Sequence, residues 1–258
     1  MSSRAMGTEP ASDLWLPANW NAPPRIAAGT TLRRGGVSRA PFDSLNLAMH
    51  VGDLPGAVTE NRRRVAEALE LPSEPVWLNQ IHGDTVIKGS PHGKPVSADG
   101  CYTDQGGVVC AVMTADCIPL LLCNRAGSEI AAVHVGWRGL CAGIIPAAMA
   151  SFQEKAANLL AWIGPHISAK HYEVGNEVRA ACADMDEDAI NGFTRNQQGN
   201  WQADLDKITR IILVKHGLTA VSGCGRCTYA EDRDFFSYRR ANRTGRMASF
   251  IWMAKSNN

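Results

Sequence analysis

The sequence has almost no net charge and no apolar segment long enough to cross a membrane. Its 26 lysines and arginines nearly balance its 25 aspartates and glutamates, which leaves a net charge of +1. This balance gives no field that would gather nucleic acid or an acidic membrane surface, so neither is an expected partner. The longest apolar runs, residues 108–113 and 118–123, are too short for a bilayer. No positively charged flank precedes a long apolar run, so no secretory signal is expected and the predicted location is the cytoplasm.

Several sequence signatures are also missing. None of the seven histidines forms a His-x-His pair, the pattern typical of multicopper oxidases. A single CxxC, from Cys224 to Cys227, has no second pair that would complete a structural zinc site. Repeats, heptads and long charged faces are absent, which disfavours a protein that acts mainly through interactions. The eight cysteines are predicted to be reduced thiols, some packed and some binding metal.

The composition is that of an ordinary globular protein. Of the 258 residues, 45% are hydrophobic and 20% are charged, and 24 glycines are spread along the chain. We expect one domain over residues 1–258, with residues 1–24 as an extended arm whose tryptophans pack on the body. The oligomeric state, monomer or homodimer, is left open by the sequence.

Hydrophobic periodicity indicates an α/β (α+β) sandwich with a mixed β-sheet core flanked by helices. Short apolar and β-branched runs predict strands at residues 25–32, 76–81, 108–113, 117–123, 130–135, 162–163, 220–223 and 246–253. Amphipathic or small-residue segments predict helices at residues 58–71, 140–160, 172–183 and 204–216.

A candidate metal site consists of His82, Cys117 and His134. The three residues lie on or beside predicted strands, and strand ends are where α/β folds keep their sites. Two imidazoles and a thiolate suit Zn²⁺, and three protein ligands leave the fourth tetrahedral position for water or substrate. The spacings of 35 and 17 residues match no compact zinc-finger pattern. From the residues alone, the alternative of a turn histidine, a packed thiol and a core imidazole stays open.

Seven short segments carry a resemblance to a known family. In chain order they are NQIHGD, ADG, TADCIPLLL, AAVHVGWRG, IGPHI, FFSYRR and TGR, within residues 29–253. They resemble the signature segments of the YfiH/laccase-domain family, whose members are described as polyphenol oxidases and as purine nucleoside phosphorylases. The resemblance implies zinc bound by His82, Cys117 and His134. It also implies a mixed α/β sandwich of the YfiH-like type shared with a group of proteins regarded as cysteine hydrolases.

Arg138 is the strongest further candidate on chemical grounds. It lies in the loop of residues 136–139, between the predicted strand of His134 and a predicted helix. Its guanidinium and the N–H groups of the loop could take phosphate beside the metal, and the alternative is a surface ion pair. Asp99 is a candidate substrate-binding or acid/base group if its loop folds over the site, with a turn role as the alternative.

Two further segments match the family, SLNLAMHVGD with Asn46 and ENRRR with Arg62. Asn46 and Arg62 could line the pocket as donors to ribose, base or phosphate, and a structural role is the alternative. His50 is expected in the wall of the pocket, because a fourth histidine ligand would close the zinc site. Asp116 directly precedes Cys117, and neighbouring side chains of a strand point to opposite faces, so Asp116 is expected to serve another partner than the metal.

The resemblance implies zinc-dependent phosphorolysis of adenosine, inosine and methylthioadenosine, with adenosine deaminase activity. Purine nucleosides and phosphate are therefore the predicted partners, and the preferred nucleoside is left open. Phosphorolysis calls for cationic donors such as Arg138 and Arg62. Deamination calls for metal-activated hydroxide and an acid/base group, but the combined H-x-E and P-C-x-x-C signature of zinc deaminases is absent.

Two other activities stay open. Cys117 could be the nucleophile of a metal-free Cys/His hydrolase, with His82 or His134 as its base. Such an enzyme would suit the removal of a wrongly added L-serine from the peptidoglycan precursor UDP-MurNAc-L-Ser, an activity described in the family. Copper (Cu²⁺) in place of zinc (Zn²⁺) would give a copper-dependent polyphenol oxidoreductase, since Cys/His sites also accept copper.

Overall fold

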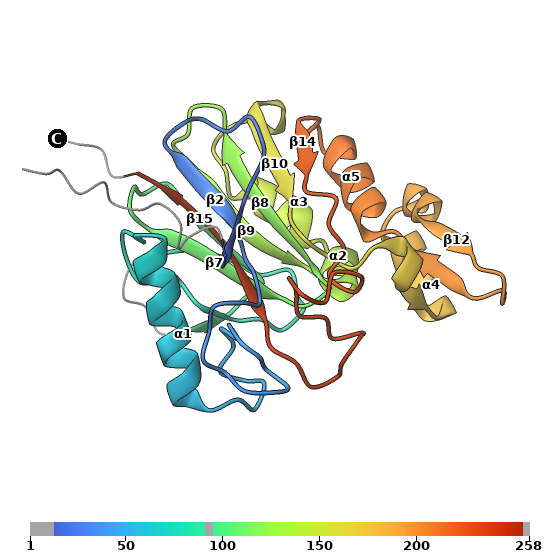
Figure 1. Ribbon diagram of the computed structural model, residues 1–258. Helices are drawn as coiled ribbons and strands as arrows, with labels where there is room; N and C mark the ends of the chain where they lie inside the picture. The colour runs from blue at the N-terminus through green and yellow to red at the C-terminus, as the bar shows by residue number, and fades with distance from the viewer. Residues whose placement is uncertain (1–12, 91–94, 255–258) are drawn as a thin grey trace, which may run out of the picture.

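Two β-sheets packed face to face, with helices on both outer sides, form the body of the protein (Figure 1). The computed structural model describes residues 13–90 and 95–254. The layers are, in order, helix α1 (Pro55–Ala68), a four-stranded sheet, a six-stranded sheet, and a layer that contains α2 (Trp137–Ala142), α3 (Ile144–Ala150) and α5 (Leu205–Lys215). This arrangement confirms the predicted mixed α/β architecture, whereas the likeness to cysteine hydrolases and the single domain stay predictions.

The six-stranded sheet carries most of the site. Its strands run in the order β14 (Val221–Gly223), β10 (Leu159–Ile163), β8 (Ile118–Asn124), β9 (Ile130–Val135), β6 (Gly100–Thr103) and β4 (Val86–Lys88). The outermost pair at each edge is parallel and the inner pairs are antiparallel. Every residue of β8 and β9 is buried, because both faces of this sheet are covered.

The four-stranded sheet separates the central core from helix α1. Its order is β1 (Trp15–Pro17), β2 (Ile26–Thr31), β15 (Met247–Met253) and β7 (Val109–Thr114), with every neighbouring pair antiparallel. Along β7, Val112 faces the six-stranded sheet and Ala111 faces α1, as the alternation of a strand requires. The side chains on the two faces of this short strand therefore belong to two separate apolar clusters.

The outer layer on the far side of the six-stranded sheet continues into a smaller lobe. Ile145 of α3 and Ile208 of α5 belong to the same buried apolar cluster as Leu120 of β8. Beyond α2 lies the lobe, at the right of Figure 1. Its elements are β11 (Glu173–Val174), α4 (Asn176–Met185), β12 (Phe193–Arg195), β13 (Trp201–Ala203) and the 3-10 helices η2 (Ala169–His171) and η3 (Glu187–Gly192). The remaining short elements are β3 (Leu78–Asn79), which pairs in parallel with β5 (Val96–Ser97), and η1 (Ala156–Asn158).

One predicted helix is wrong. Residues 140–160 do not form a single helix, because Gly143 has a φ of 96° and separates α2 from α3. Glycine adopts this left-handed conformation without the penalty that a Cβ imposes, and such a residue ends a helix. The chain leaves α3 after Ala150, and β10 begins at Leu159, earlier than the predicted strand at 162–163.

Other predicted elements are confirmed, most of them with shifted ends. The strand at 130–135 matches β9, and the helix at 204–216 matches α5 with Asp204 as its N-cap. Of the predicted strand at 76–81 only Leu78–Asn79 is regular, and the helix predicted from residue 172 begins at Asn176. Residues 1–12 of the predicted arm lie outside the described residues, whereas Trp15 further along it stacks on Phe250 with ring centroids 6.2 Å apart. No helix in the described ranges is long and apolar enough to span a membrane.

Candidate metal centre

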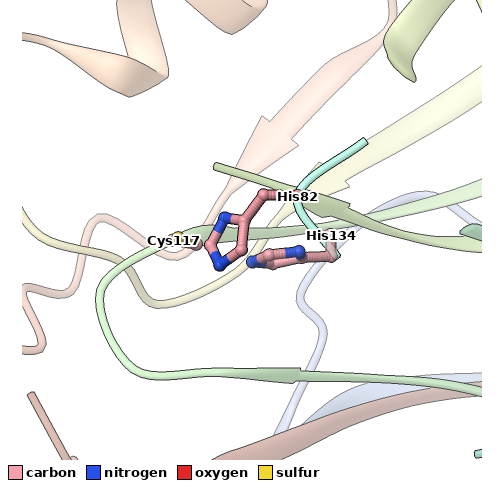
Figure 2. A group of neighbouring side chains, drawn as sticks. All are labelled: His82, Cys117 and His134. Atoms are coloured by element: carbon pink, nitrogen blue, oxygen red, sulfur yellow. The ribbon is translucent and has the colours of Figure 1, made fainter. Parts of the chain in front are cut away.

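His82, Cys117 and His134 converge beside the six-stranded sheet (Figure 2). Their possible ligand atoms all lie within 4.8 Å of one another. The two imidazoles meet edge to face, with ring centroids 4.7 Å apart and an interplanar angle of 73°. The structure thus brings together the three residues that the sequence singled out as metal ligands.

Strand register explains why two of these residues meet. The antiparallel pairing of β8 with β9 sets Ile118 opposite Val135 and Pro119 opposite His134. Cys117 directly precedes β8, so its sulfur reaches the same end of the pair as the His134 ring. His82 comes from the segment between β3 and β4 and has a left-handed φ of 60°. That conformation costs a non-glycine residue about 1–2 kcal/mol, so other contacts must hold it.

Asp99 supplies these contacts from beneath the site. Its side chain is fully buried, between β5 and β6. Its carboxylate accepts the backbone N–H groups of Ile81 (3.2 Å), His82 (3.0 Å) and Gly83 (2.7 Å). The same carboxylate lies 2.8 Å from Nδ1 of His134. One buried side chain therefore fixes the backbone at one histidine and the ring orientation of the other.

The donor set fits a zinc ion. Because Asp99 holds Nδ1 of His134, the Nε2 atom of that ring is left for the metal, the usual carboxylate–histidine–zinc relation. Small side-chain movements would bring two nitrogens and one sulfur to the ~2.0–2.3 Å that Zn²⁺ requires. Gly136 leaves the room for this, since a Cβ there would lie 2.9 Å from Nδ1 of His82 and 3.0 Å from the Cys117 sulfur.

Electrostatics distinguish the two histidines in the metal-free protein. Burial opposes a charge on His134, but the charge of Cys117 and the hydrogen bond to Asp99 outweigh it and raise the pKa of His134 to about 9. Burial and the neighbouring His134 lower the pKa of His82. A metal ion must therefore displace a proton from His134 near neutral pH, whereas the lowered pKa of His82 favours the neutral form that binds metal.

A cavity of about 590 Å³ opens onto the three ligands. This volume lies in the range of small-molecule sites. Aromatic rings and arginines dominate its wall, and the one acid among its lining residues is Asp116. Besides the ligands, the wall consists of His50, Gln80, Met113, Thr114, Ala115, Asp116, Trp137, Arg138, Tyr172, Tyr238, Arg239 and Arg246.

Arg138 and His50 both line this cavity. Arg138 is exposed, and its guanidinium lies 4.5 Å from the centroid of the Trp137 ring. It forms no ion pair with any residue in the described part of the chain, so the alternative of a surface ion pair finds no support there. His50 lies in the wall outside the three-ligand group, as expected.

Asn46 and Arg62 are absent from the lining residues. Asn46 is fully buried. Its side-chain amide accepts a hydrogen bond from the Ala48 N–H at 3.0 Å and donates one to the Ala48 carbonyl at 3.1 Å. Arg62 donates two hydrogen bonds to the Leu47 carbonyl, at 2.8 and 3.0 Å, and stacks 3.7 Å from the centroid of the Trp77 ring. We propose that both act on the site indirectly, by bracing the loop that carries His50.

Asp99 and Asp116 also differ from their sequence-based description. Asp99 lies under the ligands rather than in a loop over the site, so we propose that it positions them without touching substrate. Asp116 lies in a turn with a φ of 94°, not on a strand. As expected, its carboxylate serves other partners, the Thr228 hydroxyl at 2.6 Å and the Arg239 N–H at 2.7 Å.

Sequence reasoning missed several wall residues. Tyr238, Arg239 and Arg246 lie in the FFSYRR and TGR segments, so a signal was present, but nothing in the sequence placed them beside β8 and β9. Tyr172 reaches the cavity from just before β11 of the smaller lobe. Gln80 of NQIHGD pairs through both ends of its amide with the backbone of Met113, at 2.7 and 2.8 Å. It ties the His82 segment to the end of β7.

Comparison with known families settles the relationship of this chain. Residues 27–254 match the model of the family described as multi-copper polyphenol oxidoreductase laccase. The chain belongs to this family. The purine nucleoside phosphorylase YfiH of Escherichia coli is 49% identical to this chain over 236 residues, which cover 91% of this chain and 96% of the relative. The purine nucleoside phosphorylase of Pseudomonas aeruginosa is 47% identical over 240 residues, which cover 93% and 98%.

Solved structures agree with this relationship. The crystal structure of a Neisseria meningitidis protein is 43% identical to this laccase-family chain and superposes with a TM-score of 0.89, covering 93% of this chain and 99% of that one. The YlmD protein of Geobacillus stearothermophilus is 29% identical with a TM-score of 0.87, covering 94% and 97%. The predicted family is confirmed. In the described residues a single three-ligand group is found, where the family description speaks of several coppers.

Removing the sulfur ligand tests the metal centre. We expect Cys117→Ala to lose about a hundredfold or more in zinc affinity, because two imidazoles remain where three donors converged. Zinc per chain, measured by mass spectrometry after dialysis, reports the loss. Cys224→Ala, a thiol outside the group, is the matched control and should keep its zinc. Equal zinc contents in the two variants would show that Cys117 is not a ligand.

The role of Asp99 is tested by removing its charge alone. Asp99→Asn keeps the size of the side chain but loses the carboxylate that accepts from Nδ1 of His134, so zinc affinity should fall about 10–100-fold. Competition with a chromogenic chelator measures the change, and circular dichroism checks the fold. The control is Asp84→Asn, an exposed carboxylate of the same NQIHGD segment. Unchanged affinity in Asp99→Asn would refute the positioning role.

Proposed function

We propose that this protein is a zinc-dependent purine nucleoside phosphorylase acting on adenosine, inosine and methylthioadenosine, with accompanying adenosine deaminase activity. The observation that carries the proposal is a three-ligand centre in the wall of a cavity rich in arginines and aromatic rings. The names of the relatives at 49% and 47% identity support the phosphorylase activity. Purine nucleosides and phosphate are the proposed substrates.

Zinc is the metal we propose for this centre. Imidazole and thiolate donors suit Zn²⁺, and a site with three protein ligands keeps a position open for chemistry. Copper would also accept these donors, but a multicopper oxidase needs several ions, and the described residues contain one such group. When bound, zinc supplies a Lewis acid that polarises an oxygen or acidifies water.

Phosphorolysis forms one bond and breaks one bond at C1′ of the ribose. A phosphate oxygen attacks C1′, the bond from C1′ to N9 of the purine breaks, and the base leaves with a proton while ribose-1-phosphate forms. The protein must hold a dianion beside the ribose, which requires positive groups in fixed positions. Arg138, Arg239 and Arg246 surround the cavity, and we propose that Arg138 contributes to phosphate binding.

Aromatic side chains of the wall suit the purine base. Trp137, Tyr172 and Tyr238 line the cavity, and a flat base gains free energy from stacking on such rings. All three rings are already paired with cations. Trp137 pairs with Arg138, Tyr172 with Arg239 and Tyr238 with Arg246, at 4.5, 5.1 and 5.7 Å from the ring centroids. A base and an anion would therefore meet the same ring–guanidinium pairs. The proposed deamination, which exchanges the C6 amino group of adenine for a water oxygen and releases ammonia, would use the same cavity.

A second candidate is a Cys/His hydrolase acting on peptidoglycan precursors. The observation that favours it is the electrostatic coupling of Cys117 to His134, in which the charge of the sulfur raises the pKa of the imidazole. A thiolate beside a positively charged histidine is the arrangement of cysteine nucleophiles. This candidate predicts turnover without metal, whereas the phosphorylase requires zinc.

Product analysis tests the proposed function. Zinc-loaded protein is incubated with adenosine, inosine and methylthioadenosine, each with and without phosphate, and the products are separated by chromatography. We expect free base and the corresponding ribose-1-phosphate only where phosphate is present, and inosine from adenosine in both cases. Free base formed equally without phosphate would indicate hydrolysis, and no product from any nucleoside would refute the proposal. Cys117→Ala controls for a contaminating phosphorylase.

A further inference from the structure

Of the three arginines that line the cavity, Arg138 and Arg239 are exposed, whereas Arg246 is half-buried. It directly precedes β15 and lines the cavity together with the three metal ligands. Its Nη1 donates to the carbonyls of Thr244 and Gly245, both at 3.0 Å. Its Nε and Nη2 atoms donate to no residue in the described part of the chain, and no carboxylate there forms an ion pair with it. Two donors of a fixed guanidinium are thus left for a ligand.

The surrounding structure holds Arg246 in one position. Its backbone N–H donates to Oδ1 of the fully buried Asn46 at 3.0 Å, and its carbonyl accepts from the N–H of Leu47. Gly245 allows a close turn, since a Cβ there would lie 2.7 Å from the ring of Phe236. The turn that carries Arg246 is therefore tied to the loop of residues 46–50, which carries His50.

The charged groups in this part of the cavity wall favour the binding of an anion. Burial lowers the pKa of the Arg246 guanidinium, and the nearby Cys117 and Asp116 oppose this effect only in part. A bound anion would offset the remaining desolvation cost. Asp116, the one acid of the lining, already accepts from Thr228 and from the backbone of Arg239. Burial and the charges of Arg246 and Arg62 lower the pKa of His50. The lowered pKa favours the neutral His50 ring, which has one N–H to donate.

We propose that Arg246 binds the phosphate, with His50 beside it, and so forms the anion subsite next to the metal centre. The proposal rests on the phosphorylase function and names the residue that holds its nucleophile. Nε and Nη2 of an arginine form the fork that matches two oxygens of one phosphate. Both arginines lie over an aromatic ring, Arg138 over Trp137 and Arg246 over Tyr238. Arg138, which the sequence indicated, is however exposed, so its share in phosphate binding is smaller. Asn46 and Arg62 act on this subsite by fixing its two elements.

The test compares four arginine variants in steady-state kinetics with inosine. We expect Arg246→Gln to raise KM for phosphate by about 10–100-fold, the value of one or two charge-assisted hydrogen bonds. Arg246→Lys keeps the charge but lacks the fork, and should still raise it by roughly tenfold. Arg138→Gln should raise it by less than Arg246→Gln. Arg125→Gln, an exposed arginine outside the cavity lining, should leave it unchanged.

Separate readouts keep the inference distinct from the proposed function. Zinc content and melting temperature establish that each variant is folded and loaded, and equilibrium dialysis with inosine should give the same Kd for Arg246→Gln as for the unmodified protein. If the unmodified protein carries out phosphorolysis and Arg246→Gln keeps its phosphate KM, the inference is overturned and the function stands. If no phosphorolysis occurs, phosphate binding is measured by calorimetry. Binding that Arg246→Gln abolishes supports the anion subsite, and equal or absent binding overturns it.

Discussion

The buried carboxylate of Asp99 is the interaction on which the candidate site depends. It joins a loop residue with a left-handed backbone, His82, to a strand residue, His134, through hydrogen bonds of 3.0 and 2.8 Å. Without it, the N–H groups of three successive residues would lose their acceptor and the His134 ring would lose its orientation. The third ligand, Cys117, needs no such link, because the register of β8 with β9 places it beside His134. One strand pair and one carboxylate thus build the centre.

Charge is arranged in two tiers around this centre. Beneath it, the carboxylate of Asp99 favours a cation, and the Cys117 sulfur is a donor that binds metal as the thiolate. Around the cavity mouth, Arg138 and Arg239 are exposed, and Arg246 lies deeper with two donors unused by the described residues. A metal ion below and an anionic substrate above would satisfy both tiers, which is the demand of phosphate-dependent chemistry at a metal site. The anionic diphosphate of a peptidoglycan precursor would also suit the upper tier, so the requirement for metal, and not the arginines, separates the phosphorylase from a Cys/His hydrolase.

The sequence predicted the family and most of the strands, and it singled out the three residues that the structure brings together, because these features depend on short segments. Long-range placement could not be predicted. Asn46 and Arg62 lie in segments that do reach the site, yet their polar groups face the backbone of residues 47 and 48. Arg246 meets Asn46 across 200 positions of sequence, a contact that only the pairing of β15 with its neighbours produces. The prediction of one helix at 140–160 was wrong for a local reason. The segment is rich in small residues, and the sequence did not distinguish Gly143, which ends α2, from the others.

The central claim is that one metal ion at His82, Cys117 and His134 is required for phosphorolysis. Protein stripped with a chelator is titrated with zinc while bound metal and ribose-1-phosphate formation are measured in the same samples. The account predicts no turnover in the stripped protein and activity that rises in proportion to bound zinc until one ion per chain is present. Full phosphorolysis in protein shown to contain no metal would contradict it.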